Sequence, residues 1–389
     1  MDLSSKYDAI IVGGGPTGLS AAIFIKNLGK SVIILEKGPI LGAELRGETL
    51  HLDPILDEIL GEGVMDKITL SKTKNREFFP PLPSKETMIE VIRRTPSIVF
   101  DWIQWIGLFT EKIQELKIPF ILNAEVCDTI FNEHTVVGVK FKHSEGSIQE
   151  VFGNTVFACD GHSSVISRKY CKKKPIVNFP IIKCLMKNGN YSSKAFKYFL
   201  VPTGALDFAP KFPPFIIFLF PRNEKNLETG IIIQTDNAYE LGVPIPPVKE
   251  IMGIWVKIKS EYPVFSEMIK RASILHEEIT AIPMTGPISE FSPRPGLVIL
   301  GDAAGFVETS GGSGLISSIK MAQYWTNSIF SDEPHSEIKN KFKKTELYKH
   351  IIKVAKRYNA FRRFVFVKLM SVDRICRFWW LLSFILKHA

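Results

Sequence analysis

One segment near the N-terminus constrains the fold more than any other part of the chain. Residues Tyr7–Lys37 read YDAIIVGGGPTGLSAAIFIKNLGKSVIILEK, which predicts a strand, a glycine turn, a helix and a second strand. Gly13, Gly15 and Gly18 fit GxGxxG, which gives a tight turn, room for a pyrophosphate and close packing of helix on strand. Glu36 ends the second strand, where a carboxylate can accept a hydrogen bond from a ribose hydroxyl. The segment predicts a dinucleotide site with cofactor contacts from Gly13, Gly15, Thr17, Gly18, Glu36 and Lys37.

This segment alone does not distinguish NAD from FAD. The rest of the chain holds no second GxGxxG unit for a separate nicotinamide domain, which favours FAD. Two later segments also combine a strand, an aspartate and glycines: TVFACDGHSSVISR at 155–168 and GDAAGFVETSGGSGL at 301–315. Glycine costs conformational entropy, so the second of these segments needs backbone without side chains. A strand, an aspartate and a glycine-rich turn before a helix predict an anion or cofactor site.

These motifs together resemble those of FAD-dependent oxidoreductases in the para-hydroxybenzoate hydroxylase-like superfamily. The pattern DGxxSxxxR, frequent there, runs here from Asp160 to Arg168. Within that superfamily, residues 301–315 are most similar to the geranylgeranyl reductase family, whose members have GDAA followed by a glycine-rich turn. The resemblance follows the motif order over residues 5–330. It implies that FAD carries the reaction and that Asp160 contributes to the cofactor site.

The resemblance also implies roles within residues 301–315. Gly301 and Asp302 would contact the ribityl or pyrophosphate part of FAD. The turn around Gly312 would pass beneath the isoalloxazine ring, where side chains would collide with it. Gly314 and Leu315 would begin a helix whose N-terminal dipole favours the anionic reduced flavin.

Three further assignments follow from the resemblance. Arg46-Gly47 occupies the place where reductases of this family often have a Cys-Gly pair near the flavin, and both residues would contact the cofactor. Arg46 is thus the candidate catalytic residue, which would bind a flavin phosphate or stabilise negative charge on the ring; the alternative is a surface-loop arginine. Arg94 matches an arginine that contacts FAD from a helix, and Arg93 is an equal candidate by spacing. Val126 ends a predicted strand and would contact adenine through its backbone.

The motif order predicts an α/β fold with a Rossmann-like FAD-binding domain built from residues 1–174 and 286–335. Residues 175–285 contain short apolar runs, prolines and aromatic residues, which predict an antiparallel β-sheet substrate domain that roofs the flavin. Geranylgeranyl reductases carry YxWxFP and then GxG in this region. The matching stretch, IIFLFPRNEKNLETGII, keeps FP and the first glycine but lacks the Tyr, the Trp and the second glycine. Its Phe218 and Phe220 belong either to the substrate pocket or to the core.

The C-terminal region, residues 336–389, is predicted to be helical and is strongly basic. Residues 339–389 hold 14 Lys and Arg against two Asp and Glu, a net charge of +12, whereas the remaining chain carries −3. Its longest uncharged run, residues 378–386, is far below the ~20 residues that span a bilayer. The tail therefore lies on an anionic membrane surface or packs on the FAD domain with a solvated basic face.

These observations predict an FAD-dependent oxidoreductase that reduces carbon–carbon double bonds of an isoprenoid or other hydrophobic lipid. NAD(P)H or a small redox protein would supply electrons. Five scattered cysteines without CxxC spacing fit the cytoplasm, and the basic tail predicts a location peripheral to the membrane. No motif resembles a nucleic-acid binder, which argues against a nucleic-acid partner. Two alternatives stay open: a flavin monooxygenase, which RGETL favours, and a membrane-docked flavoprotein that reduces quinone.

Overall fold

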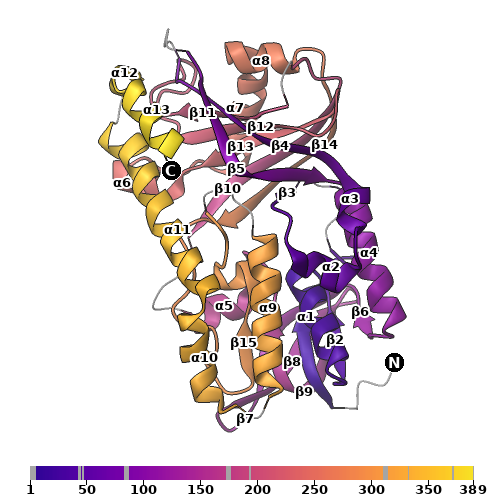
Figure 1. The fold of residues 1–389 in the computed structure, drawn as a ribbon. Coiled ribbons are helices and arrows are strands. Elements are labelled where there is room, and N and C mark those ends of the chain that lie inside the picture. Colours follow the sequence, from indigo (N-terminus) through magenta and orange to yellow (C-terminus); the bar gives the residue numbers. More distant parts are fainter. Residues whose placement is uncertain are drawn as a thin grey trace.

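The computed structural model describes residues 6–42, 45, 48–82, 87–171, 177–191, 194–309, 314–331, 333–369 and 372–388. Two β-sheets lie one above the other, and helix α11 (Glu346–Arg363) runs along one side of both (Figure 1). The strands of the first sheet are β1 (Tyr7–Val12), β2 (Val32–Leu35), β6 (Phe120–Ile121), β7 (Ala124–Asn132), β8 (Thr135–His143), β9 (Ile148–Ala158) and β15 (Leu297–Ile299).

The first sheet has the buried parallel centre that the glycine motif requires. Its order is β6-β2-β1-β9-β8-β7, with β15 also paired to β9, and β1 runs parallel to both β2 and β9. All of β2 and the last four residues of β1 are buried, as expected for parallel strands covered on both faces. Helices α1 (Pro16–Asn27) and α9 (Leu315–Ile329) pack side by side against this sheet, and α4 (Trp102–Glu115) lies beside α1 (Figure 1).

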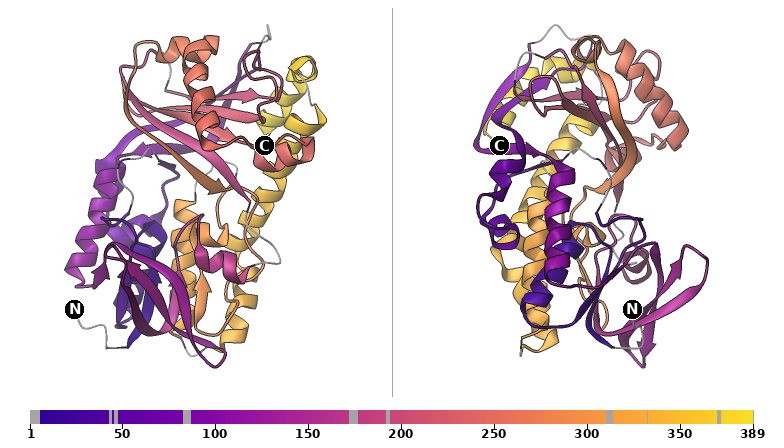
Figure 2. Two further views of the ribbon diagram at one scale, coloured as in Figure 1. Left: turned by 180° about the vertical axis from the view of Figure 1, so that it is seen from behind. Right: turned by 90° about the vertical axis from the view of Figure 1, so that its right-hand side faces the viewer.

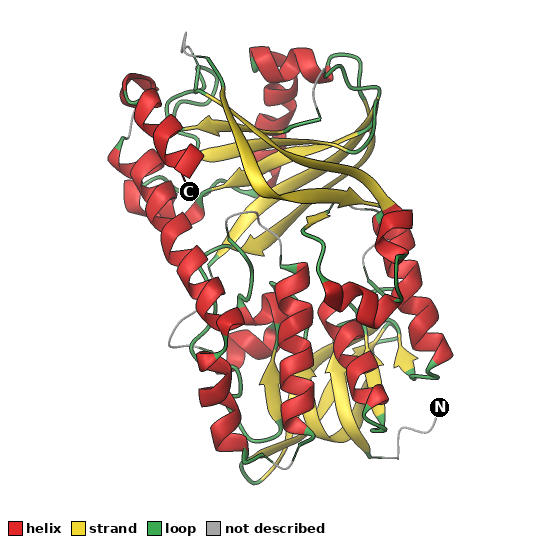
Figure 3. Cartoon of the chain, viewed as in Figure 1, coloured by secondary structure: helices red, strands yellow, loops and turns green. Residues whose placement is uncertain are grey.

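The second sheet curls above the first (Figure 3). Its order is β14-β10-β13-β12-β11-β4-β5-β3; β11 and β4 pair in parallel, and the other pairs are antiparallel. Its strands are β3 (Thr49–Leu50), β4 (Thr69–Phe79), β5 (Ile89–Phe100), β10 (Asn178–Lys187), β11 (Phe196–Val201), β12 (Phe215–Pro221), β13 (Leu227–Ile233) and β14 (Ser273–Pro283).

Strand β12 shows why this sheet can roof a cavity. Phe215, Ile217 and Leu219 belong to a core cluster with the helices α7 (Val248–Glu261) and α8 (Pro263–Ile269). The alternate residues Ile216, Phe218 and Phe220 line a cavity on the opposite face. Side chains of a strand alternate between its two faces, so an apolar strand can serve the core and a pocket at once.

The remaining helices connect these parts or continue the C-terminal region (Figure 2). They are α2 (Pro54–Leu60), α3 (Val64–Ile68), α5 (Val165–Tyr170), α6 (Thr235–Leu241), the 3₁₀ turn η1 (Gly301–Ala304), α10 (His335–Lys344), α11 (Glu346–Arg363), the π-turn η2 (Phe364–Lys368), α12 (Val372–Arg377) and α13 (Trp379–His388).

The predicted fold class is confirmed: a Rossmann-like sheet, a largely antiparallel second sheet and a helical C-terminus are present. The predicted domain boundaries differ from the structure in one place. The sequence predicts that residues 49–100 belong to the FAD-binding domain, whereas β3, β4 and β5 belong to the second sheet. The helix expected around Arg94 is also wrong, because this residue lies within strand β5.

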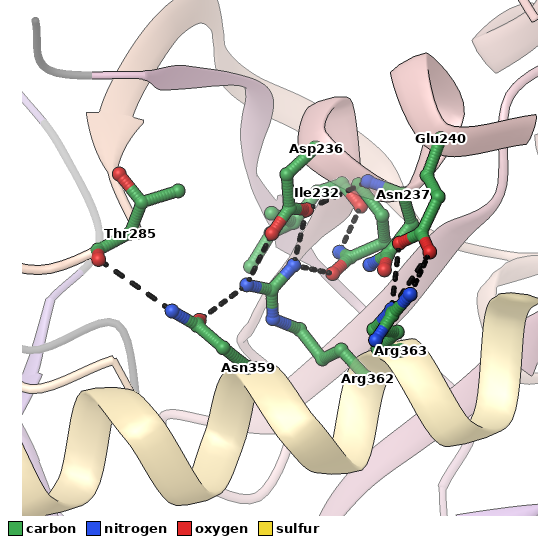
Figure 4. A network of polar contacts seen from close by, with 9 residues as sticks. Ile232, Asp236, Asn237, Glu240, Thr285, Asn359, Arg362 and Arg363 are labelled. Atoms are coloured by element: carbon green, nitrogen blue, oxygen red, sulfur yellow. Dashed lines mark hydrogen bonds and ion pairs between the residues drawn. The ribbon is translucent and has the colours of Figure 1, made fainter. Parts of the chain in front are cut away.

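A buried arginine attaches the C-terminal helix α11 to the second sheet's helix α6 (Figure 4). Arg362 is fully buried and donates two hydrogen bonds to the carboxylate of Asp236, at 2.6 and 2.9 Å. The same guanidinium donates to Asn359 Oδ1 at 2.6 Å and lies 4.8 Å from the centre of the Phe179 ring. Arg363, the next residue, pairs with Glu240 on the exposed side of the helix. The tail thus packs on the protein along α11.

We expect Arg362→Met to lower the free energy of unfolding by about 2–4 kcal/mol, because it removes one partner of a largely buried ion pair. The matched variant Arg363→Met breaks an exposed pair, which water screens, and should lower the free energy of unfolding much less. Urea unfolding of both variants measures the difference. Equal losses in the two variants would contradict this account of how α11 is held.

Candidate functional site

The glycine turn between β1 and α1 is packed too closely for most side chains. Gly13 has a φ of +102°, and a Cβ there would lie 2.5 Å from the Cys159 carbonyl oxygen. A Cβ on Gly18 would lie 2.0 Å from the Gly13 carbonyl oxygen. At Gly15, in contrast, a Cβ would meet no atom within 4 Å. Packing therefore requires glycine at Gly13 and Gly18, whereas Gly15 leaves open space at the start of α1, where a ligand can approach the backbone.

Glu36 closes this turn from the end of β2. Its carboxylate accepts hydrogen bonds from the backbone N–H groups of Gly14, at 2.5 Å, and Gly38, at 2.6 Å. A carboxylate offers about four acceptor positions, so Glu36 can hold the turn and still accept from a ribose hydroxyl. Lys37, the next residue, is exposed.

The second wall of the site comes from η1 and the start of α9. Gly301 has a φ of +61°, and a Cβ there would lie 2.5 Å from Thr17 Oγ1, so η1 packs directly on the first turn of α1. Gly314 precedes α9, and its Cβ position lies 3.2 Å from Asp302 Oδ1. Because both helices begin after a glycine, neither N-terminus is capped by the side chain of its own N-cap residue. Two helix dipoles and their free N–H groups are therefore available to an anion.

One cavity connects these helix starts to the roof strands of the second sheet. Five of the predicted cofactor residues line it, namely Gly15, Thr17, Asp302, Gly314 and Leu315. The facing wall includes the apolar residues Ile181, Ile216, Phe218, Phe220, Ile232, Ile282 and Met284, and also the polar residues Lys183, Tyr198, Glu228 and Thr280. Phe218 and Phe220 line the pocket and also belong to a buried cluster with Val99, Ile181 and Phe196. The cavity has a polar floor that suits phosphates and a ring system, and an apolar roof that suits hydrocarbon.

Other predicted residues lie away from this cavity. Asp160 is not among the residues that line it, although the adjacent Gly161 and His162 are. Burial raises the pKa of the Asp160 carboxyl, and its Oδ1 is enclosed without a hydrogen-bond partner among the described residues. Val126 is buried in β7, where it pairs with Phe141.

Of the arginines expected near the flavin, Arg94 is described by the structure and Arg46 is not. Arg94 is exposed on strand β5 and does not line the cavity, so nothing in its surroundings supports contact with the cofactor. Arg46, Gly47 and Gly312 lie outside the described residues. Their assignment therefore stays a prediction.

Sequence patterns missed several polar residues of the cavity. Lys183 of β10 donates to Glu48 Oε1 at 2.6 Å, and this pair joins the roof to the segment that follows residue 47. Tyr198 of β11 and Tyr358 of α11 also line the cavity. Burial raises the pKa of both phenols, that of Tyr358 to about 12, so both are neutral at pH 7. Glu48 stands within the quoted RGETL, whereas no local pattern indicated the two tyrosines.

This arrangement fits FAD. The open space at Gly15 accommodates a pyrophosphate, and the start of α9 with Asp302 offers donors and an acceptor to a ribityl chain and ring. FAD would supply hydride chemistry there, which no side chain of the protein provides.

Comparison with known proteins agrees with this site. A family model described as FAD dependent oxidoreductase matches residues 8–168. A curated relative, digeranylgeranylglycerophospholipid reductase 2 of Methanothermobacter thermautotrophicus, is 24% identical over 325 residues, which cover 82% of this chain and 76% of that protein. The crystal structure of a geranylgeranyl bacteriochlorophyll reductase-like protein from Thermoplasma acidophilum superposes with a TM-score of 0.78. The chain is an FAD-dependent oxidoreductase that resembles the geranylgeranyl reductases.

The structural likeness extends over almost the whole length of this chain. The Thermoplasma structure covers 99% of this chain and 92% of its own length at 20% identity. A myxobacterial chondrochloren halogenase also shares the fold, with a TM-score of 0.68, 15% identity, and coverage of 92% of this chain and 82% of that one. At such identities the likeness shows the fold, and the reaction must be argued from the site.

Gly15→Ala tests the cofactor site without disturbing the packing. Its Cβ meets no atom, so the free energy of unfolding of the flavin-free protein should stay within about 1 kcal/mol of the original. The dissociation constant for FAD should rise at least about tenfold, which corresponds to about 1.4 kcal/mol, because the methyl group would occupy the space left for the pyrophosphate. Flavin fluorescence titration measures the affinity. Gly253→Ala, at a helix position equally open but remote, is the control; unchanged affinity in Gly15→Ala would contradict the assignment.

Proposed function

We propose that this oxidoreductase reduces carbon–carbon double bonds of an isoprenoid or another hydrophobic lipid. One observation carries the proposal: the apolar roof that includes Ile216, Phe218 and Phe220 faces the starts of α1 and α9 across a single cavity. A hydrocarbon chain seated against this roof would lie over a flavin seated on the floor. The name of the Methanothermobacter relative, a lipid reductase, supports the same substrate class.

The residues of the cavity would bind, orient and enclose the reactants. The first turns of α1 and α9 would hold the cofactor through backbone N–H groups. Ile216, Phe218 and Phe220 of the roof, all under 10% exposed, would fix the alkene and keep water away. FAD held there would supply, in its reduced form, the hydride that the alkene needs. Arg46, which replaces the family's cysteine, stays the proposed residue for stabilising negative charge near the ring.

The second alkene carbon needs a proton, and two phenols of the cavity hold one. Tyr198 is clamped between Phe78, stacked at 5.1 Å between ring centres, and Phe220, edge-on at 5.6 Å. Tyr358 is carried by the helix that Arg362 fixes. Both hydroxyls stay protonated at neutral pH because burial raises their pKa. We propose that the Oη atom of Tyr198 or Tyr358, both of which line the cavity, delivers the proton.

The reaction also needs partners outside the chain. We propose that NAD(P)H or a small redox protein reduces the flavin from the cytoplasm. The basic C-terminal region would keep the protein peripheral to an anionic membrane, where a lipid substrate resides.

Anaerobic reoxidation of the reduced flavin tests this function. Addition of a geranylgeranyl lipid should reoxidise the flavin and add two hydrogens to the lipid for each double bond reduced, as followed by absorbance and mass spectrometry. A flavin that stays reduced until oxygen is admitted would instead support a monooxygenase, the alternative that RGETL favours. Reoxidation by quinone alone would support electron transfer to quinone.

The double variant Tyr198→Phe/Tyr358→Phe tests the source of the proton. The rate of lipid-dependent flavin reoxidation should fall about 10²-fold, the usual contribution of a positioned general acid, with an unchanged flavin absorption spectrum. The single variants show which phenol acts. A double variant with the original rate would contradict proton donation by these tyrosines.

A further inference from the structure

The last helix, α13, is apolar on the side that packs on the protein and also on the side that does not. On the packed side, Leu382 and Leu386 are buried in a cluster with Val91 of β5. Trp379 is also buried there, and its Nε1 donates to the Thr87 carbonyl oxygen at 2.8 Å. These contacts fix the helix against the cavity-facing side of the second sheet, the side opposite α7 and α8 (Figure 2). They leave the opposite side of α13 facing outward.

Two large aromatic residues occupy that outward side. Trp380 is 67% exposed and Phe384 is 61% exposed, and they stand four residues apart, one above the other on a helix. Single exposed apolar side chains occur elsewhere on this protein and need no explanation. A helix that is apolar all round, in contrast, is normally buried on every side. The exposed aromatic pair therefore indicates that something else covers it.

Basic residues flank the aromatic pair. Arg377 lies three residues before Trp380, and Lys387 lies three residues after Phe384; both are exposed. The chain has no acidic residue between Arg374 and Lys387. We call Trp380, Phe384 and Lys387 the outer face of α13; Arg377, the last residue of α12, lies just before it. Aromatic residues between basic ones are the pattern of a helix that lies in the interface of an anionic membrane.

The size and charge of the region favour a lipid surface over the other possible partners. Helix α13 has ten residues, about 15 Å at 1.5 Å per residue, so it cannot cross a bilayer core. Within the part of the chain that the structure describes, no helix is long and apolar enough to do so. A second copy of this chain would bring the same basic residues against the face, and like charges would oppose that contact. Anionic lipids would instead attract them.

The buried side of α13 lies next to the substrate cavity. The cluster under α13 includes Ile216, whose side chain lines the cavity, and Tyr198 packs against the same cluster. The C-terminal helices thus bound the cavity on this side, with the outer face of α13 turned away from it. We propose that the outer face of α13 seats the protein on an anionic phospholipid surface, and that the lipid substrate enters the cavity past this helix. The entry route rests on the proposed lipid reduction, whereas the membrane contact does not.

Vesicle flotation of the FAD-loaded protein tests the contact. We expect binding to vesicles of phosphatidylcholine and phosphatidylglycerol, and weaker binding to phosphatidylcholine alone. The double variant W380S/F384S should lower the partition coefficient at least about tenfold. The matched variant V248S/V256S, which changes two exposed valines of α7, should bind as the original does. All four substituted side chains are exposed, so the midpoint of thermal unfolding should be nearly the same in both variants and the original. This measurement separates a folding defect from a loss of vesicle binding.

Lipid reduction in two media tests the entry route. W380S/F384S should reduce a detergent-dispersed lipid at the original rate but a vesicle-embedded lipid more slowly, in proportion to its lost binding. Unchanged vesicle binding by the variant would overturn the proposal, and so would a change of oligomeric mass in sedimentation, which would assign the face to a second copy. Absence of lipid reduction by the original protein in both media would contradict the proposed function and leave the flotation result to decide the membrane contact.

Discussion

The cofactor site depends on how closely three chain segments approach one another at the edge of the first sheet. The Gly13 backbone lies against the Cys159 carbonyl at the end of β9, and Gly301 lies against Thr17 at the start of α1. No side chain fits at either contact. The same closeness brings the N-termini of α1 and α9 to one cavity, where their dipoles add. An anionic dinucleotide is the natural complement of this geometry.

The rest of the molecule adds an apolar surface for a hydrophobic substrate to that site. The curled second sheet closes the cavity with alternate side chains of β12, while the other side chains of the same strand form its own core. The buried Arg362 holds α11 against α6, and this helix contributes Tyr358 to the cavity. The C-terminal region thus completes the wall of the cavity and also presents basic and aromatic residues outward.

Much of the cofactor site could be predicted from the sequence, because its signals are local. The spacing of Gly13, Gly15 and Gly18 and the buried runs of β1 and β2 define strand, turn and helix within one short segment. The position of β4 and β5 could not be predicted this way. Their place is set by pairing with β11, where Lys197 bonds Glu77, 120 residues apart in the chain. Tyr198 and Tyr358 also reach the cavity through contacts between residues that are far apart in the sequence. No local sequence pattern indicates such contacts.

The central claim is that cofactor and lipid share one cavity, with the hydrocarbon against the flavin. Titration of the oxidised, FAD-loaded protein with a fully saturated isoprenoid lipid tests it directly, because such a lipid can bind but cannot react. The flavin absorption bands should shift, and the shift should saturate at the same lipid concentrations as binding measured independently. Saturable lipid binding that leaves the flavin bands unchanged would place the lipid elsewhere and contradict the account.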